Sequence, residues 1–406
     1  MTAHKDFMPV IVGTDINAYY VARCFHEEYG IKPTLLGKEP MGFTSYSNIT
    51  HMVYDARIWE ADALIERLIL MAEELKHSYK QLILIGTNDF YVRLIIENRE
   101  RLEPYYLFNK LSLEMLNKII VKDEFYQLCE TYGLDIPKTI IYDCGFGVNQ
   151  EYPTITEFPV ILKPGNGDVY YRNKFEGQHK VYRLESNEAV RETIDLVKAS
   201  GYDQKLIIQE YIPGDDTLMY DSVFYSNQQG KVEFISFARV LLQEHAITAI
   251  GNYTALITRY NEDLMLKLKN FVEAIGYVGF GNFDIKYDIR DGKYKLFEVN
   301  IRQGRSSYYV TACGYNLMKY LVDDLIYHKN KEFLLLDKPM VFSVVPMSIV
   351  KKYIKEEELR QEVRSYIRKR YFTNPLIYRK DRNVKRFFYN IIRGFNYHRK
   401  YKNNKW

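Results

Sequence analysis

The residues best suited to chemistry lie on one predicted hairpin, GFGNFDIKYD-IRDG-KYKLFEVN. Asp284 lies on its first strand, and Glu298 and Asn300 share one face of the second because side chains alternate along a strand. Two carboxylates and an amide oxygen form a set suited to Mg²⁺, with Mn²⁺ as an alternative, and such a site takes further ligands from water and nucleotide phosphates. A solvated polar hairpin is the other interpretation. The following segment, IRQGRSS (301–307), is rich in anion-binding groups and favours the metal site.

Two lysines upstream could bind phosphate groups. Lys163 ends an apolar strand (FPVILKP) and precedes a loop with two glycines, where backbone amides can also meet an anion. Lys122 begins a predicted helix, where its charge opposes the helix dipole, so the position suits a ligand contact better than helix stability. Taken alone, either lysine is more typical of an exposed surface.

A third stretch, QEYIPGDD (209–216), closes a predicted strand with a proline that ends backbone pairing. The free backbone groups of Gln209, Glu210, Tyr211 and Ile212 could recognise an adenine edge, and Asp216 could bind ribose hydroxyls. A plain strand end with a turn explains this stretch equally well.

Strands and helices alternate before these segments, which predicts a parallel sheet covered on both faces. The predicted strands are 9–14, 34–36 and 81–86; a helical pattern follows the first of them through residue 29, and a second helix is predicted at 61–76. GTDIN at 13–17 has a single glycine and is more typical of an ordinary strand-to-helix turn than of a dinucleotide site.

The next part of the chain reads as an α+β nucleotide-binding unit. Its predicted helices are 122–133, 187–199 and 262–275, and its predicted strands are 136–142, 159–162, 205–212 and 231–242. The fold class is therefore α/β and α+β, with domains expected at 1–110, 111–330 and 331–406.

Composition bounds the class of protein. The chain has 406 residues, 47% of them hydrophobic and 27% charged, which is typical of a globular protein with two or three packed units. It has no run of 18 apolar residues, its N-terminus lacks a secretory layout, and its four cysteines are far apart. We expect a reduced, cytoplasmic protein.

Charge is segregated along the chain. Residues 351–406 carry 18 Lys/Arg against 5 Asp/Glu, a net of +13, so the other residues sum to 4 − 13 = −9. Basic clusters alternate with aromatic and aliphatic residues, and 385–397 could form a basic amphipathic helix. Such a tail could pack on the body of the protein or attach to the anionic inner membrane face.

In this order and spacing, these pieces resemble the ATP-grasp superfamily over residues 110–330, and the alternating N-terminal part resembles the Rossmann-like domain that precedes it in that family. Lys122 and Lys163 match its two ATP lysines, IIQEYIPGDD its adenine hinge, and GNFDIKYD and FEVNIR its metal-binding strands. The segment GNGDVYYRNKFEGQHK departs from the family's compact glycine-rich loop. VGTDINAYYVARCFHEEYG and EVNIRQGRSSYYVTACG are similar to D-aspartate ligases of Gram-positive peptidoglycan synthesis.

The resemblance implies an ATP-dependent ligase that joins a carboxylate to an amine through an acyl-phosphate. Arg302, with Arg239, would stabilise the transferring phosphoryl group, and Gly304 would offer a backbone N–H to the tetrahedral intermediate. Arg305, Ser306 and Ser307 would hold the amino-acid carboxylate.

The implied reaction attaches D-aspartate to the lysine side chain of a peptidoglycan precursor. Ligation of another amino acid or small carboxylate is one alternative. A non-enzymatic protein that binds nucleic acid or membrane through its basic tail is the other, although no nucleic-acid partner is expected.

Overall fold

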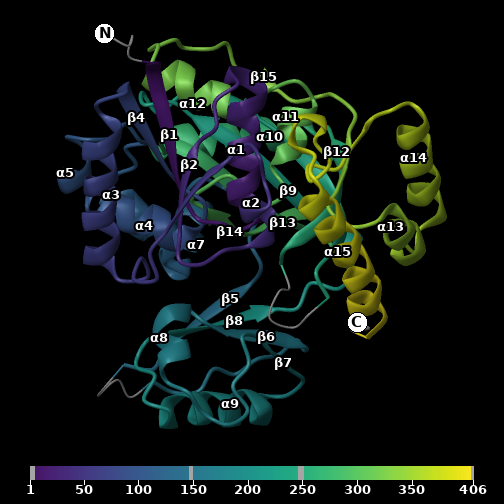
Figure 1. The fold of residues 1–406 in the computed structure, drawn as a ribbon. Coiled ribbons are helices and arrows are strands. Elements are labelled where there is room, and N and C mark those ends of the chain that lie inside the picture. Colours follow the sequence, from purple (N-terminus) through teal and green to yellow (C-terminus); the bar gives the residue numbers. More distant parts are fainter. Residues whose placement is uncertain (1–4, 146–149, 246–250, 404–406) are drawn as a thin grey trace. The chain divides into compact units, whose positions relative to one another are not determined.

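The computed structural model describes residues 5–145, 150–245 and 251–403 (Figure 1). Its contacts group the chain into two compact units. The first contains Met1–Leu116, Tyr220–Asn282 and Asn300–Trp406, and the second contains Asn117–Met219 and Phe283–Val299. Each unit is built from separated segments, so the three consecutive domains expected from the sequence stay a prediction.

The N-terminal part of the first unit is a four-stranded parallel sheet in the order β3-β2-β1-β4. The strands are β1 (Lys5–Val12), β2 (Thr34–Gly37), β3 (His51–Tyr54) and β4 (Tyr79–Gly86), and the helices are α1 (Ile16–Tyr29), α2 (Gly42–Ser45), α3 (Ala61–Leu75), α4 (Asp89–Glu97) and α5 (Arg99–Leu102). Figure 1 shows α3 on one side of this sheet and α1 on the other. Val10 and Val12 pack in one cluster with Leu64 and Leu68 of α3, and the predicted parallel sheet is confirmed.

The rest of the first unit is organised around a larger sheet. Its order is β14-β13-β9-β11-β12-β16-β17, with β10 paired to β9 and β15. The strands are β9 (Met219–Ser226), β10 (Val232–Ile235), β11 (Phe237–Gln243), β12 (Tyr253–Arg259), β13 (Gly279–Asp288), β14 (Lys293–Asn300), β15 (Leu334–Leu335), β16 (Val341–Ser343) and β17 (Phe372–Thr373). The predicted hairpin is confirmed as β13 and β14.

One predicted strand, 231–242, is wrong as a single element. It is interrupted at Ser236, whose N–H donates to the Val223 carbonyl (2.9 Å) while its hydroxyl donates to the same carbonyl (3.0 Å). Both parts pair with β9, but their other edges have different partners, β15 for β10 and β12 for β11. A change of partner strand, which local sequence does not encode, therefore splits the run.

The helices of the C-terminal part include one long basic element. They are α10 (Glu262–Ala274), α11 (Tyr308–Ala312), α12 (Leu317–Leu325), α13 (Met347–Tyr353), α14 (Glu357–Arg368) and α15 (Val384–Asn403). The helix predicted over 385–397 is confirmed and is longer at both ends, while 404–406 lie outside the described residues. No helix among the described residues is long and apolar enough to cross a membrane.

The second unit contains an antiparallel sheet in the order β5-β8-β6-β7. Its strands are β5 (Thr139–Asp143), β6 (Val160–Pro164), β7 (Tyr182–Leu184) and β8 (Lys205–Glu210), and its helices are α7 (Lys122–Thr131), α8 (Gly167–Arg172) and α9 (Asn187–Ala199), with α6 (Leu113–Ile120) at the boundary. The Ser186 hydroxyl caps α9 by accepting the Ala189 N–H. Val190 and Ile194 of α9 then pack with Leu162 and Ile208 of the sheet.

Candidate functional site

The two predicted metal carboxylates lie together on neighbouring strands of the second unit. Asp284 is on β13, and Glu298 is on β14 with its Oε2 3.0 Å from the Lys122 Nζ. The charge of Lys122 lowers the pKa of Glu298 to about 2 against the opposing effect of burial, helped by Lys163 and by a hydrogen bond with Asp284. Glu298 is therefore fully ionised at neutral pH.

The structure also brings the two predicted ATP lysines to this carboxylate. Burial disfavours charge on Lys122, but Glu298 outweighs that effect and raises the pKa of Lys122. Lys163 differs: burial and then the neighbouring charge of Lys122 hold its pKa well below its usual range. Its Nζ lies 5.9 Å from the centre of the Phe297 ring. Lys163 is a partly buried lysine beside another cation, and a bound anion would stabilise its charged form.

The donor chemistry of Asp284, Glu298 and Asn300 fits a hard divalent cation. Asn300 is two residues beyond Glu298 on β14 and so faces the same side of the strand. Its Nδ2 donates to the Asn282 carbonyl (3.5 Å), and its Oδ1 accepts from Arg302 (3.2 Å). In the part of the chain that the structure describes, no group of three or more His, Cys, Asp or Glu is placed to hold a metal. Mg²⁺ usually completes such a set of oxygen ligands with water and nucleotide phosphates.

The predicted adenine hinge follows directly from β8. Gln209 is buried and its Nε2 donates to the Thr139 hydroxyl at 2.9 Å. Glu210 accepts from the Lys138 N–H (2.9 Å), Lys295 (2.9 Å) and Arg290 (2.6 Å). Burial opposes ionisation of Glu210, but these donors lower its pKa. Glu210 therefore holds the hinge in place through its side chain.

The chain beyond this strand contains the other predicted nucleotide residues. The Tyr211 N–H donates to the Pro159 carbonyl (3.2 Å), and Ile212 is buried. Asp216 begins a short 3-10 helix, η1 (Asp216–Leu218). Lys286 lies 5.6 Å from the centre of the Tyr211 ring. All these residues belong to the second unit.

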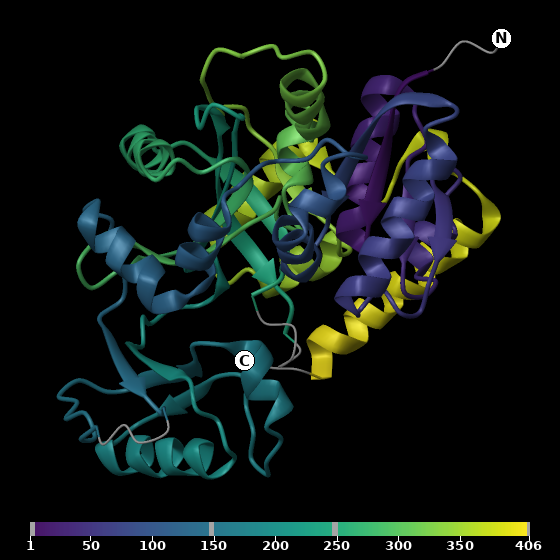
Figure 2. The ribbon, with the colours of Figure 1, turned by 90° about the vertical axis from the view of Figure 1, so that its left-hand side faces the viewer.

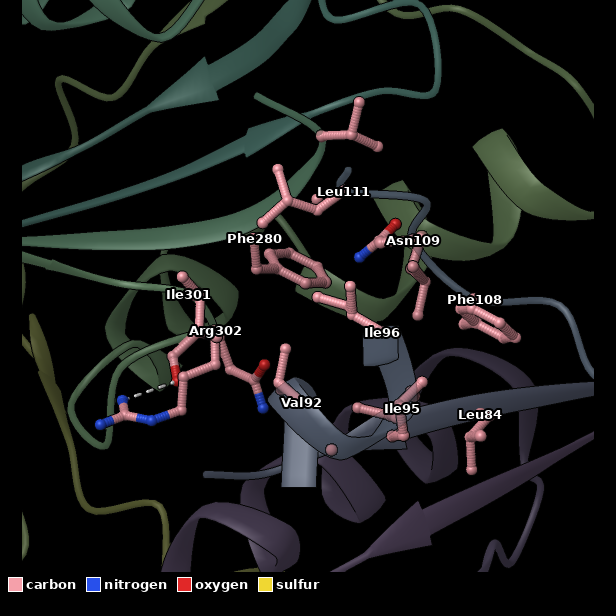
Figure 3. A pocket seen from close by; sticks show the side chains of 16 residues that line it. Leu84, Val92, Ile95, Ile96, Phe108, Asn109, Leu111, Phe280, Ile301 and Arg302 are labelled. Carbon is pink, nitrogen blue, oxygen red and sulfur yellow. Dashed lines mark hydrogen bonds between the residues drawn. The ribbon is translucent and has the colours of Figure 1, made fainter. Parts of the chain in front are cut away.

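In the first unit, Arg302 lies at the end of a largely apolar pocket (Figure 3). Its guanidinium turns away from the apolar side chains and donates to the Gln303 carbonyl at 3.4 Å. It also lies 3.2 Å from an Asp89 carboxylate oxygen. The pocket is lined by Leu84, Ile85, Gly86, Val92, Ile95, Ile96, Phe108, Asn109, Leu111, Val278, Gly279, Phe280, Ile301, Arg302, Gln303 and Leu321.

Arg302 and Arg305 each have one N–H group that could still donate to a ligand. Among the described residues, each has a buried Nε with no hydrogen-bond partner. The terminal nitrogen of Arg305 lies 3.7 Å from the Glu244 carboxylate. An unpaired buried donor is costly, and an anionic substrate group would satisfy it. These two guanidinium groups therefore fit a carboxylate or phosphoryl ligand.

The loop that contains Arg302 and Arg305 packs against buried polar side chains. A Cβ on Gly304 would meet the Asn282 Oδ1 at 1.6 Å, so only glycine fits there. Asn282 donates to Asp221 at 2.6 Å, and burial raises the pKa of Asp221 to about 7. The Ser306 hydroxyl donates to Asp221 (3.3 Å) and the Ser307 hydroxyl to the Gly304 carbonyl (2.7 Å). Both hydroxyl protons are thus used within the protein. These serines can accept a hydrogen bond from a substrate but cannot donate one.

Arg239 occupies β11 and pairs with Glu356 at 2.8 Å. Its predicted catalytic role stays a prediction.

The sequence did not identify the residues that fasten this loop to the N-terminal sheet. The Asn17 amide donates to the Thr87 carbonyl (2.6 Å) and the Gln303 carbonyl (3.3 Å). Asp15 caps α1, and burial raises its pKa while the charges of Arg305 and Arg302 lower it. The only local signal was polar residues following a buried strand in GTDIN. That signal did not indicate that Asn17 contacts Gln303, which is 286 positions away in the sequence.

No family model matches the chain. A D-aspartate ligase from Enterococcus faecium (strain Aus0004) is 34% identical over 410 residues, which covers 97% of this chain and 96% of the relative. An L-amino acid ligase from Bacillus licheniformis has a similar structure, with a TM-score of 0.55 and 16% identity over 82% of this chain and 76% of that one. The biotin carboxylase domain of Hydrogenobacter thermophilus 2-oxoglutarate carboxylase, solved with MgADP, ADP and bicarbonate, has a TM-score of 0.58 and 15% identity over 83% and 74%. These structural likenesses establish the ATP-grasp fold, and the sequence identity makes the chain a member of the D-aspartate ligase family, an ATP-dependent ligase that forms a carbon–nitrogen bond.

Proposed function

We propose that this ligase activates the β-carboxylate of D-aspartate with ATP and joins it to the lysine side chain of a peptidoglycan precursor. The carboxylate oxygen attacks the γ-phosphorus, and ADP leaves. The lysine amine then attacks the acyl carbon, and phosphate and a proton leave. The observation that carries the proposal is the 34% identity to a D-aspartate ligase over nearly the whole chain.

Residues of the second unit, together with Asn300, support the nucleotide half of this reaction. Lys163 and Lys122 would neutralise phosphate oxygens, since phosphoryl transfer depends mainly on positioning and charge neutralisation. Gln209 to Ile212 would hold the adenine and Asp216 the ribose. Bound Mg²⁺ on Asp284, Glu298 and Asn300 would supply charge stabilisation for the phosphates, and Mn²⁺ has the same ligand preferences.

Residues of the first unit support the substrate half. The unpaired Nε–H groups of Arg302 and Arg305 would donate to the phosphoryl group and the amino-acid carboxylate respectively. The Gly304 backbone N–H would stabilise the tetrahedral intermediate. We also propose that the reaction takes place in the cytoplasm, at the inner membrane face, because the tail forms a basic helix on the outside of this unit.

Mass spectrometry of the products tests the proposal. The enzyme is incubated with ATP, Mg²⁺, a lysine-containing precursor and either D- or L-aspartate. We expect a product heavier than the precursor by one aspartyl residue with D-aspartate, together with ADP. If product formed with L-aspartate and not with D-aspartate, the proposed substrate would be wrong.

A ligase for another amino acid is the second candidate, because an L-amino acid ligase shares the fold. ADP release across a panel of amino acids separates the two. Family membership removes the non-enzymatic interpretation of the chain.

A further inference from the structure

Helix α15 turns its apolar side outward. Its buried residues are Arg386, Tyr397 and Tyr401. Its exposed large hydrophobic residues are Val384, Phe387, Phe388, Ile391, Ile392 and Phe395. On a helix of 3.6 residues per turn, these six lie on one side, within an arc of roughly 140°. This orientation is the reverse of an ordinary surface helix, which buries its apolar stripe.

Polar contacts hold the inward side of α15 on the first unit. An Arg386 terminal nitrogen donates to the Phe43 carbonyl (2.8 Å), and its Nε lies 3.3 Å from the Asp381 carboxylate. The Tyr397 hydroxyl donates to Glu244 (2.6 Å). Figure 2 shows α15 (yellow) running along the outside of the N-terminal sheet and helices. Ring contacts add to this attachment, such as that of Tyr389 with Phe43. The helix therefore attaches through hydrogen bonds, ion pairs and ring contacts, and its six exposed hydrophobic side chains stay on the outside.

The exposed side chains form a continuous surface, which we call the α15 patch: Ile377, Val384, Phe387, Phe388, Ile391, Ile392 and Phe395. Phe387 is 61% and Phe395 71% exposed. A groove beside them is lined by Leu376, Ile377, Tyr378, Asp381, Arg382, Asn383, Val384, Arg386, Phe387, Phe388, Asn390 and Ile391. Contiguous apolar surface of this kind on a soluble chain marks an interaction site.

The charge of the residues around the α15 patch indicates the charge that its partner must carry. Residues 376–403 contain nine Lys/Arg and one Asp, a net of 9 − 1 = +8. The single acid, Asp381, is buried against Arg386 and so does not reduce the exposed positive charge. The exposed basic residues are Arg379, Lys380, Arg382, Lys385, Arg399, Lys400 and Lys402. The partner must be anionic and must also accept aromatic and aliphatic side chains.

We propose that the α15 patch docks on an anionic phospholipid surface, with α15 parallel to the membrane plane and its phenylalanines inserted between the head groups. Apolar burial and attraction of basic residues to anionic lipids act together in such interfacial helices. A second copy of this chain would bring two strongly positive surfaces together, which opposes association. A nucleic acid offers the charge but not an apolar layer for the aliphatic side chains.

Vesicle binding by the full-length protein tests this surface. The protein is titrated with vesicles of phosphatidylcholine alone and of phosphatidylcholine mixed with phosphatidylglycerol, at low and high salt. The test variant is Phe387→Glu with Phe395→Glu. Trp59→Glu with Leu70→Glu is the matched control, because these side chains are similarly exposed (60% and 56%) on the N-terminal part of the same unit.

We expect binding to the anionic vesicles that salt weakens, and far weaker binding to the neutral ones. Loss of two inserted phenylalanines should reduce the affinity by about 100-fold or more, with ligation in solution unchanged. The control variant should bind as the wild type does. Lys385→Gln with Arg399→Gln should weaken binding to anionic vesicles only.

Three results would overturn the proposal. The first is equal binding by the phenylalanine variant and the wild type. In the second, light scattering shows a wild-type dimer that the phenylalanine variant converts to monomers, and no vesicles are bound; a second copy then covers the α15 patch. In the third, the protein binds a single-stranded oligonucleotide but no vesicle.

Discussion

Replacing Glu298 by glutamine removes a carboxylate that ion-pairs with the partly buried Lys122, beside Lys163. A pKa lowered from 4.5 to about 2 corresponds to roughly 3 kcal/mol of stabilisation of the charged form before screening. The Glu298 side chain is 43% exposed, so solvent reduces this contribution to about 1–2 kcal/mol. We expect Glu298→Gln to lower the free energy of unfolding by that amount at pH 7.

The same reasoning gives a pH dependence with a definite sign. The folded-state pKa of Glu298 is depressed, so its contribution to stability is present above about pH 4.5 and is lost as the pH falls towards 2. Urea unfolding between pH 3 and 7 should show the wild type and Glu298→Gln converging in acid. Glu157→Gln is the control, because Glu157 forms an exposed pair with Lys138 and should contribute little.

Measurements with ATP separate the contribution of Glu298 to stability from its proposed role as a metal ligand. Without metal, its carboxylate repels the triphosphate, so Glu298→Gln should bind metal-free ATP at least as tightly as the wild type. With Mg²⁺, the variant should lose ligation by about 10²–10³-fold or more, because a metal ligand is missing. Calorimetry and ADP release measure the two effects. Near-normal turnover in both Glu298→Gln and Asp284→Asn would refute the metal assignment.

Three further predictions follow from particular contacts. Lys163→Met should weaken ATP binding by about 10–100-fold without lowering the melting temperature of the free enzyme, because it removes a partly buried amino group with a depressed pKa; a large loss of stability would contradict this. Gly304→Ala should cost about 1–3 kcal/mol in urea unfolding, since its Cβ would meet the Asn282 Oδ1 at 1.6 Å; an unchanged midpoint would show that the loop yields. Tyr397→Phe removes the hydrogen bond to Glu244 and should cost about 1.5–3 kcal/mol, whereas a tail that is only a solvated extension would show no change.

Local pattern was sufficient for the elements that carry the predicted nucleotide residues. The short turn of the predicted hairpin placed Asp284 and Glu298 on neighbouring strands, and the strand end in FPVILKP placed Lys163 at the end of β6. These are properties of a few consecutive residues, so sequence periodicity reports them. The basic helix near 385–397 was found in the same way.

Contacts between distant segments were decided only by the tertiary structure. Nothing local shows that Glu298 pairs with Lys122, or that Asn17 holds the loop at Gln303, because strand partners and loop docking depend on the packing of the whole unit. The clearest case is which side of helix α15 faces outward. Periodicity showed that an apolar and a basic side exist. Which side faces out was decided by contacts with distant segments, namely the hydrogen bond and ion pair of Arg386 and the ring contacts of Tyr389 and Tyr401.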